Sequence, residues 1–284
     1  MTKQLLSKIE SCYSSMSKGH KRIADYITEN YDKAAFMTAA KLGDTVGVSE
    51  STVVRFASEL GFSGYPQLQK TLQEVVKSRL TSVQRMEAAG GEDMLEHAFS
   101  SDIETIKATR ESISREAFNA SVEAINRAKH IYVLGVRSAA SLASFAAFYL
   151  NFVYDSVTLI EPAGTGEAFD QAFRINKDDV CIAISFPRYS KQTINMLRFI
   201  SDRGATVISV TDSENSPIAQ FATHLLLARS SMVSFVDSLV APLSLINALI
   251  AAAASEKSGE VYSNLSSLEN IWDEYQIYQT HEDE

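Results

Sequence analysis

The chain has 284 residues and a formal net charge of -9, with 45% hydrophobic and 21% charged residues. This length allows two domains, and the composition is that of an ordinary globular protein, which excludes fibrous and disordered classes. The longest apolar run, 239–254, is too short for a membrane span and contains Pro242 and Asn247, so we expect no membrane partner.

The start of the chain and its cysteines bear on location and cofactors. Residues 1–5 lack the apolar core of a signal peptide. Cys12 and Cys181 are far apart and match no metal-binding spacing, and two free thiols fit a reducing compartment. We therefore expect a cytoplasmic protein with no metal and no cofactor.

Charge is divided unevenly along the chain. Residues 1–85 contain 12 Lys and Arg against 8 Asp and Glu, a net +4. The other 14 basic and 27 acidic residues fall in 86–284, a net -13. Because a basic segment attracts phosphates, this asymmetry predicts that only the N-terminal part touches nucleic acid.

The basic segment carries the pattern of a helix-turn-helix. An amphipathic helix is predicted over 17–30, and a second helix begins near Thr38. Gly47 then allows a tight turn, Ser49 is suited to cap a third helix, and Gly61 to end it. We predict a DNA-binding domain over 1–77, although a small helical domain with a solvated polar face is the alternative.

In a helix-turn-helix, the N-terminal residues of the second helix of the motif face the bases in the major groove. The partner predicted here is a double-stranded DNA operator. The candidates for base contact are the exposed positions Glu50, Ser51, Thr52, Arg55 and Ser58, and those for phosphate contact are Lys18, Lys21, Arg22 and Tyr65.

A polar stretch that contains Gly90 and Gly91 follows, and we predict a linker over 78–100. Beyond it, over 101–284, short apolar runs alternate with helical patterns. This alternation predicts an α/β domain with a parallel, doubly wound sheet and helices on both faces. The predicted strands cover 131–134, 157–160, 180–185, 206–210 and 225–227.

Ligands of such sheets bind beyond the carboxyl ends of the strands. The loop 185–193 follows a buried strand and precedes a helix, where backbone N–H groups attract an anion. Arg137 lies in the loop after the first strand and either forms a salt bridge or binds ligand. His130 and His224 precede strands, so no histidine is placed for catalysis, and we expect no catalytic residue.

The acidic tail, 258–284, places Trp272, Tyr275 and Tyr278 at near-helical spacing. Such a segment is expected to dock on its own domain or on a partner subunit.

Together these stretches resemble the RpiR-type family of bacterial transcriptional regulators, which join a helix-turn-helix domain to a SIS (sugar isomerase) domain. The matching residues are 38–62, 131–143, 184–193, 204–213, 216–217 and 234–238. The resemblance implies a regulator of carbohydrate metabolism genes that forms a homodimer or homotetramer. Its effector would be a small anionic sugar derivative, either a sugar phosphate or a sugar-derived acid.

The family pattern Ser-x-Ser-Gly-x-Thr places Ser185 at the first serine and Ser190 at the threonine, with Arg188 in place of glycine. Arg137 likewise replaces the second glycine of Gly-x-Gly-x-Ser. Two arginines can instead grip a carboxylate or phosphate bidentately. The ligand-binding candidates are Arg137, Ser138, Ser185, Arg188, Ser190 and Thr193. The alternatives are a sugar-phosphate isomerase and a DNA-binding regulator whose SIS domain only oligomerises.

Overall fold

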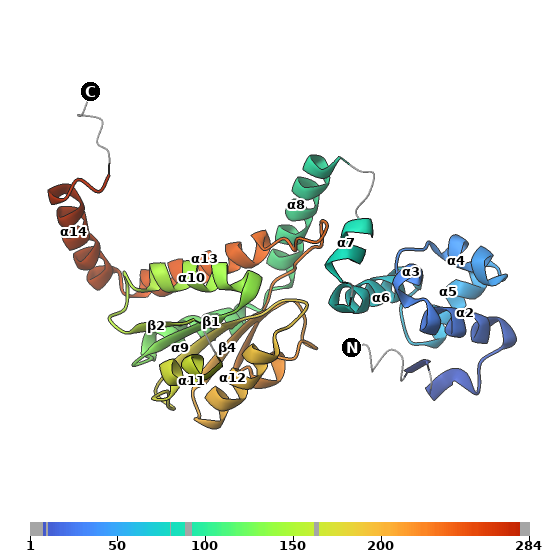
Figure 1. Ribbon diagram of the computed structural model, residues 1–284, viewed down its shortest axis with the longest axis horizontal. Coiled ribbons are helices and arrows are strands. Elements are labelled where there is room, and N and C mark those ends of the chain that lie inside the picture. The colour runs from blue at the N-terminus through green and yellow to red at the C-terminus, as the bar shows by residue number, and fades with distance from the viewer. Residues whose placement is uncertain (1–7, 10, 80, 89–92, 162–164, 279–284) are drawn as a thin grey trace. The chain divides into compact units, whose positions relative to one another are not determined.

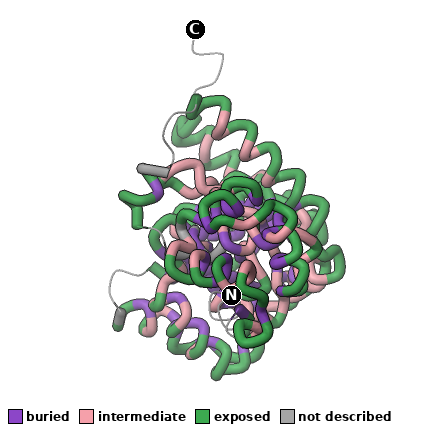
Figure 2. The backbone as a smooth tube through the Cα atoms, turned by 90° about the vertical axis from the view of Figure 1, so that its right-hand side faces the viewer, coloured by how far each residue is buried: buried purple, intermediate pink, exposed green. Residues whose placement is uncertain are grey.

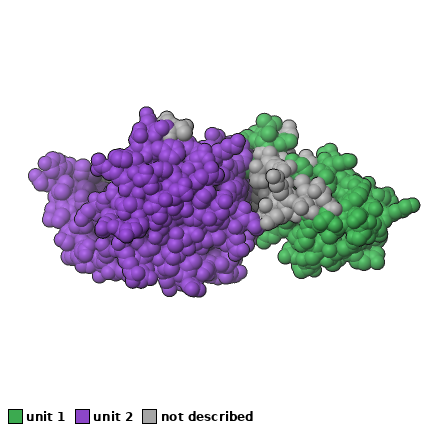
Figure 3. Space-filling model, turned by 90° about the horizontal axis from the view of Figure 1, so that it is seen from below, with its two compact units in different colours: residues 1–90 green, residues 91–284 purple. Residues whose placement is uncertain are grey.

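The computed structural model describes residues 8–9, 11–79, 81–88, 93–161 and 165–278. The chain divides into two compact units, Met1–Gly90 and Gly91–Glu284, coloured separately in Figure 3. No helix in the described ranges is long and apolar enough to cross a membrane. The expectations for residues 1–5, for 89–92 of the linker and for the tail after 278 fall outside the described residues.

Unit 1 is entirely helical in its described part. Its longest helices bury one face each, and Figure 2 shows buried and exposed positions alternating along the tube. Ser17, Thr38 and Ser49 each accept a backbone N–H at a helix start, which is why three helices begin where the sequence predicts. The helices are α2 (Lys18–Glu29), α3 (Tyr31–Ala34), α4 (Ala39–Val46), α5 (Glu50–Glu59), α6 (Tyr65–Arg79) and α7 (Ser82–Ala88).

Helices α4 and α5 form the predicted helix-turn-helix. Gly47 ends α4 with a left-handed φ of 68°, and the N–H of Val48 donates to the carbonyl of Gly43 at 2.9 Å. Gly43 is required by the close approach of this turn, since a Cβ there would lie 2.7 Å from the carbonyl oxygen of Val48. Leu42 and Phe56 are fully buried and join the two helices into one core.

Unit 2 is built on a five-stranded, all-parallel sheet in the order β2-β1-β3-β4-β5 (Figure 1). Its fold confirms the predicted α/β class. The strands are β1 (Ile131–Gly135), β2 (Val157–Ile160), β3 (Val180–Ile184), β4 (Thr206–Thr211) and β5 (His224–Leu227). The helices are α8 (Met94–Ser112), α9 (Arg115–Arg127), α10 (Ala140–Leu150), α11 (Thr165–Ala172), α12 (Lys191–Asp202), α13 (Val240–Glu256) and α14 (Ser258–Glu274), with short 3-10 turns at Arg137–Ala139 and Ala219–Phe221.

Two hydrophobic layers cover the two faces of the sheet. Ile131 and Val133 of β1 pack with α9, α10 and α13, while Tyr132 and Leu134 pack with α11 and α12. Successive strand residues point to opposite faces, so a strand that is apolar at every position must be covered on both sides. Part of the segment predicted as a linker is helical, because it contains α7 and the start of α8. The domain boundaries at 77 and 101 stay predictions.

The two cysteines differ in burial, and we expect them to differ in reactivity. Cys181 lies in the middle of β3 with no exposed surface, and burial raises the pKa of its thiol to about 12. Its reactive thiolate form is therefore scarce at pH 8. Ellman's reagent should titrate one thiol per native chain, that of the half-buried Cys12, and two in denaturant. Rapid titration of two native thiols would contradict this packing.

Candidate functional site

The exposed face of α5 carries the residues predicted to contact bases. Glu50, Ser51, Arg55 and Ser58 are exposed. The Nε of Arg55 donates to the carbonyl of Ser51 at 3.3 Å, which holds the base of its guanidinium along the helix. These four side chains therefore lie on one solvent-facing surface at and after the N-terminus of α5.

Thr52 differs from these four residues because it is half-buried. Its hydroxyl lies 2.8 Å from the hydroxyl of Ser49, and its methyl group packs toward Gly19 of α2. Thr52 thus helps to fix α5 against α2, with one edge left at the surface.

The cations of α2 lie beside this turn. Lys18 and Arg22 are exposed, and the guanidinium of Arg22 lies against Gly47, where a Cβ would be only 2.3 Å from its Nη2. The ammonium of Lys21 sits 5.3 Å from the ring centroid of Tyr13, a cation–π contact that leaves it half-buried. Three positive charges are thereby held on α2, next to the helix-turn-helix.

Tyr65 is a correction to the sequence analysis. It is only 3% exposed, and its hydroxyl donates to the carbonyl of Met37 at 2.7 Å. Burial raises the pKa of this hydroxyl to about 12. Because its one O–H is used inside the helical unit, we drop Tyr65 from the proposed phosphate contacts.

In unit 2, the loops after β1 and β3 meet at the carboxyl edge of the sheet. Gly135 and Ile184 are partners across these neighbouring parallel strands, so the residues that follow them enclose a common pocket. The pocket is small, about 40 Å³, and polar groups form much of its wall. It is lined by Val136, Arg137, Ser138, Ala139, Ser185, Phe186, Pro187, Arg188, Ser190 and Asp237.

Both arginines of this pocket have an unusual backbone. Arg137 has a φ of 58° and Arg188 a φ of 63°, in the left-handed region that favours glycine. In the part of the chain that the structure describes, only Gln276 shares this feature among non-glycine residues. A left-handed residue with a Cβ costs roughly 1–2 kcal/mol, and such strain concentrates at binding sites. Both guanidinium-bearing side chains are exposed at the pocket mouth.

The serines of the pocket have local structural partners. Ser190 caps α12 by accepting the N–H of Gln192 at 3.2 Å, and Ser185 is nearly buried with its N–H donated to Val210. Ser138 is exposed at the 3-10 turn that precedes α10. The N-terminus of the 12-residue α12, with Ser190 as its N-cap, therefore opens toward the pocket.

Thr193 is not brought to this pocket. It is fully buried one turn into α12, and its Oγ1 has no hydrogen-bond partner within the described ranges. The expectation that it contacts ligand came from its place in the loop sequence. Its burial removes it from the surface that a ligand can reach, and we drop it from the proposed contacts.

Asp237 also lines the pocket, although it was not among the ligand-binding candidates. It precedes α13, which begins at Val240, and it forms an antiparallel bridge with Met232 in the segment after β5. The rule that sites lie beyond carboxyl strand ends was a signal that could have found it.

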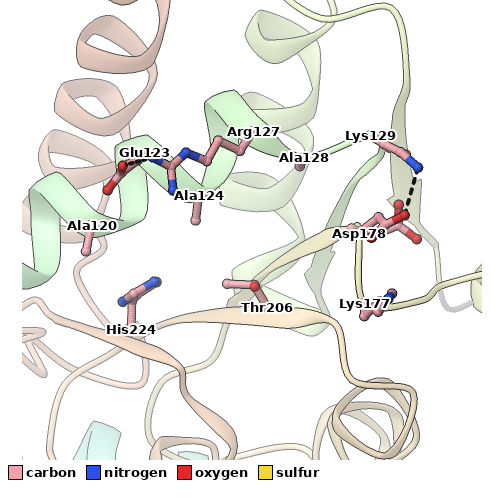
Figure 4. Close-up of a pocket in the computed structure, with 11 residues that line it drawn as sticks. Ala120, Glu123, Ala124, Arg127, Ala128, Lys129, Lys177, Asp178, Thr206 and His224 are labelled. Atoms are coloured by element: carbon pink, nitrogen blue, oxygen red, sulfur yellow. Dashed lines mark hydrogen bonds and ion pairs between the residues drawn. The ribbon is translucent and has the colours of Figure 1, made fainter.

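A larger cavity, about 490 Å³, lies at the opposite edge of the sheet (Figure 4). Its charged side chains largely pair with one another: Lys129 with Asp178 at 2.8 Å, and Arg127 with Glu123. His224 also lines it, while the nearby His130 bonds Ser156 and Thr158 and its pKa is lowered by burial. We favour the smaller pocket as the ligand site, because the carboxyl ends of two strands and a helix N-terminus converge there. No cluster of three metal-ligating side chains occurs among the described residues.

Comparisons with known proteins agree with this architecture. The model of the helix-turn-helix domain of the rpiR family matches residues 3–79, and the model of the SIS domain matches residues 124–252. The transcriptional regulator HexR of Pseudomonas aeruginosa is 25% identical over 228 residues, which are 78% of this chain and 77% of HexR.

Two solved structures are similar in fold. The sugar isomerase domain of an RpiR transcription factor from Sphaerobacter thermophilus is 30% identical with a TM-score of 0.58, and the match covers 61% of this chain and 96% of that domain. The NanR protein of Vibrio vulnificus, solved as a complex with ManNAc-6P, is 23% identical with a TM-score of 0.59, and the match covers 95% of this chain and 98% of NanR.

Proposed function

Because this chain belongs to the RpiR family of helix-turn-helix transcriptional regulators with a SIS domain, we propose that it controls carbohydrate metabolism genes in response to a small anionic sugar derivative. The observation that carries this proposal is the pair of left-handed arginines on neighbouring loops of one pocket. A left-handed backbone at an arginine is unfavourable by itself, and an anion held by both guanidinium groups would offset this cost.

In the proposed complex, Arg137 and Arg188 hold the anionic group of the effector. A guanidinium matches the geometry of a phosphate or carboxylate and can bind it bidentately. Hydroxyls of Ser138, Ser185 and Ser190 add donors, and the dipole of α12 favours negative charge at the same place. NanR was solved with a sugar phosphate, which supports the same ligand class here.

The output of the proposed switch is α5. Glu50, Ser51, Thr52, Arg55 and Ser58 would read an operator in the major groove, and Lys18, Lys21 and Arg22 would contact its phosphates. Two or four copies of the chain would present two such helices to the half-sites of a palindromic operator. Effector binding would shift the equilibrium between two arrangements of the subunits. In one of them the two α5 helices match the spacing of the half-sites, and in the other they do not.

A ligand screen tests the proposal. Sugar phosphates and sugar acids are added to the full chain, and the melting temperature is measured. A true effector at 100 times its dissociation constant should stabilise unit 2 by about 2.7 kcal/mol, which raises the melting temperature by several degrees. Arg188→Ala or Arg137→Ala should lower the apparent affinity for the effector, obtained from the shift in melting temperature, at least tenfold. Each change removes two hydrogen bonds from a charged donor.

The matched control for this screen is Arg198→Ala, which removes an exposed arginine of α12 that does not line the pocket. It should respond as the unmodified chain does. A stabiliser whose effect is unchanged in both pocket variants would disprove the site, and a complete lack of stabilisers would favour a SIS domain that only oligomerises.

A sugar-phosphate isomerase is the second candidate, and the carboxylate of Asp237 in the pocket favours it. Isomerisation needs a general base beside the bound sugar, and a carboxylate can serve. The family relatives with a helix-turn-helix are named as regulators, so we rank this activity second. Turnover of an aldose or ketose phosphate that is lost in Asp237→Asn would establish it.

A further inference from the structure

Helix α14 lacks a partner that explains its stability. None of its 17 residues is buried, although Val261, Leu265, Leu268, Trp272 and the adjoining Tyr275 recur every three or four residues and form an apolar stripe. Most of the stability of a helix in a protein comes from the packing of its apolar face. In Figure 1, α14 leaves the end of α13 and extends away from the sheet. Its apolar stripe therefore calls for a surface to cover it.

The contacts of α14 with its own unit are few. The ring of Trp272 meets that of Phe152 edge-on at 6.2 Å, and the amide of Asn264 donates to the carbonyl of Phe152 at 3.4 Å. A cleft of about 450 Å³, with Ser263 and Asn264 on its wall, separates the start of the helix from the sheet edge. Val261, in the first turn of α14, also packs against the core of unit 2, whereas Leu265 is left exposed.

The neighbouring helices present an uncharged surface next to α14. Across α10 and α13 the only charged residue is Glu256, in the last position of α13. Phe148 is 58% exposed and Tyr149 42% exposed. Rings of Phe148, Tyr149 and Phe152 contact one another and continue to Trp272. An apolar surface of this extent on a soluble protein marks an interface.

A groove between α8, α9 and α13 complements α14. It holds about 270 Å³, its floor is apolar, and Arg110 and Arg115 stand exposed along it. Neither arginine forms an ion pair within the described ranges of the chain. The floor residues include Ile106, Ile113, Phe118 and Leu245.

The charges of α14 match this groove. No Lys or Arg occurs after Lys257. Glu269 and Asp273 directly follow the stripe residues Leu268 and Trp272, so they flank the stripe on one side, roughly 100° around the helix. The apolar stripe of α14 with its acidic edge is therefore complementary to the apolar floor of the groove with its two arginines.

We propose that α14 of one copy of this chain docks into the α8–α9–α13 groove of a second copy, with Glu269 and Asp273 opposite Arg110 and Arg115. The groove lies along the first half of α13, from Ala241 to Ala248, whereas α14 follows its last residue. When two copies of α13 run antiparallel across a two-fold axis, each α14 reaches the groove of the other copy. The uncharged surface of α10 and α13 is then covered in the same dimer. This proposal depends on neither the effector nor the operator.

Charge reversal in the full chain tests the docking. Arg110→Glu with Arg115→Glu should shift the dimer toward monomer and raise its dissociation constant at least about tenfold, because four attractive pairs per dimer become repulsive. Glu269→Arg with Asp273→Arg should do the same. All four changes together should restore the dimer. Light scattering after size-exclusion chromatography gives the mass, and circular dichroism confirms that each variant is folded.

The control variant is Glu274→Arg, which makes the same charge change on the far side of α14 and should leave the dimer intact. The proposal is overturned if the unmodified chain is a monomer at micromolar concentration. It is also overturned if both reversed pairs stay dimeric, or if the fourfold variant remains monomeric.

A cross-link separates docking on a second copy from docking on the same copy. In a Cys12→Ser background, Leu268→Cys and Ala248→Cys should oxidise to a covalent dimer. Asn270→Cys, on the opposite side of α14, should not cross-link with Ala248→Cys. A disulfide that forms within a single chain, or none from Leu268→Cys, would overturn the proposal.

Discussion

Replacing Arg55 by alanine is expected to lower operator affinity by about tenfold to a hundredfold, since a bidentate arginine–guanine contact is worth about 1–3 kcal/mol. Arg55 is exposed on α5, and only its Nε is used in the hydrogen bond to the carbonyl of Ser51. The measurement is a gel shift with duplexes that the unmodified protein selects from a random-sequence pool. The variant should lose its preference for one base at a single position of the selected sequence and keep its preferences at the others.

Two kinds of control make the Arg55 result interpretable. Lys18→Ala and Arg22→Ala should weaken binding to all DNA sequences alike. Each should also lower the slope of log affinity against log salt concentration by about 1, the loss expected for one phosphate contact. Arg127→Ala removes an exposed arginine from unit 2 and should change nothing. If Arg55→Ala binds the selected duplexes as tightly as the unmodified chain, α5 does not read them through this side chain.

Replacing Gly43 by valine is expected to destabilise unit 1 by about 1–3 kcal/mol and to abolish selective DNA binding. The added side chain meets the carbonyl oxygen of Val48, a backbone atom of the turn, so α5 must shift relative to α4. The melting transition of unit 1 should fall by about 4–8 °C per kcal/mol, as for other small domains.

Unit 2 has its own core and should keep its melting transition and its oligomeric mass in the Gly43 variant. Gly166→Val is the matched control, because no atom lies within 4 Å of a Cβ built there. Normal operator binding by Gly43→Val would show that the turn tolerates a wider separation of α4 and α5 than the structure has.

Helices, turns and strands were predicted correctly where the residues of the segment itself determine its structure. Ser49 and Gly47 specify a cap and a left-handed turn by their own chemistry, and the apolar run 180–184 identifies a strand that is covered on both sides. The α/β class of unit 2 and the helical class of unit 1 followed from such patterns.

What the sequence missed depends on contacts between distant residues. Tyr65 is buried because its hydroxyl reaches Met37, 28 positions earlier, and Asp237 reaches the pocket through the fold of the segment after β5. Nothing in the residues that neighbour Tyr65 signals its contact, whereas the place of Asp237 after a strand was a signal. The replacement of glycine by arginine at 137 and 188 was visible in the sequence, but the left-handed backbone that both arginines retain was not.

That retained backbone has a consequence for engineering. Since both loops follow a path that glycine also accepts, positions 137 and 188 can be exchanged between arginine and glycine without rerouting the main chain. Arginine supplies a charged fork, whereas glycine exposes backbone N–H groups and leaves more space. If the proposed site is correct, a library restricted to these two positions would vary the charge and size of the ligand that the pocket accepts on a fixed scaffold. Such a library is a compact starting point for biosensors tuned to different acidic metabolites.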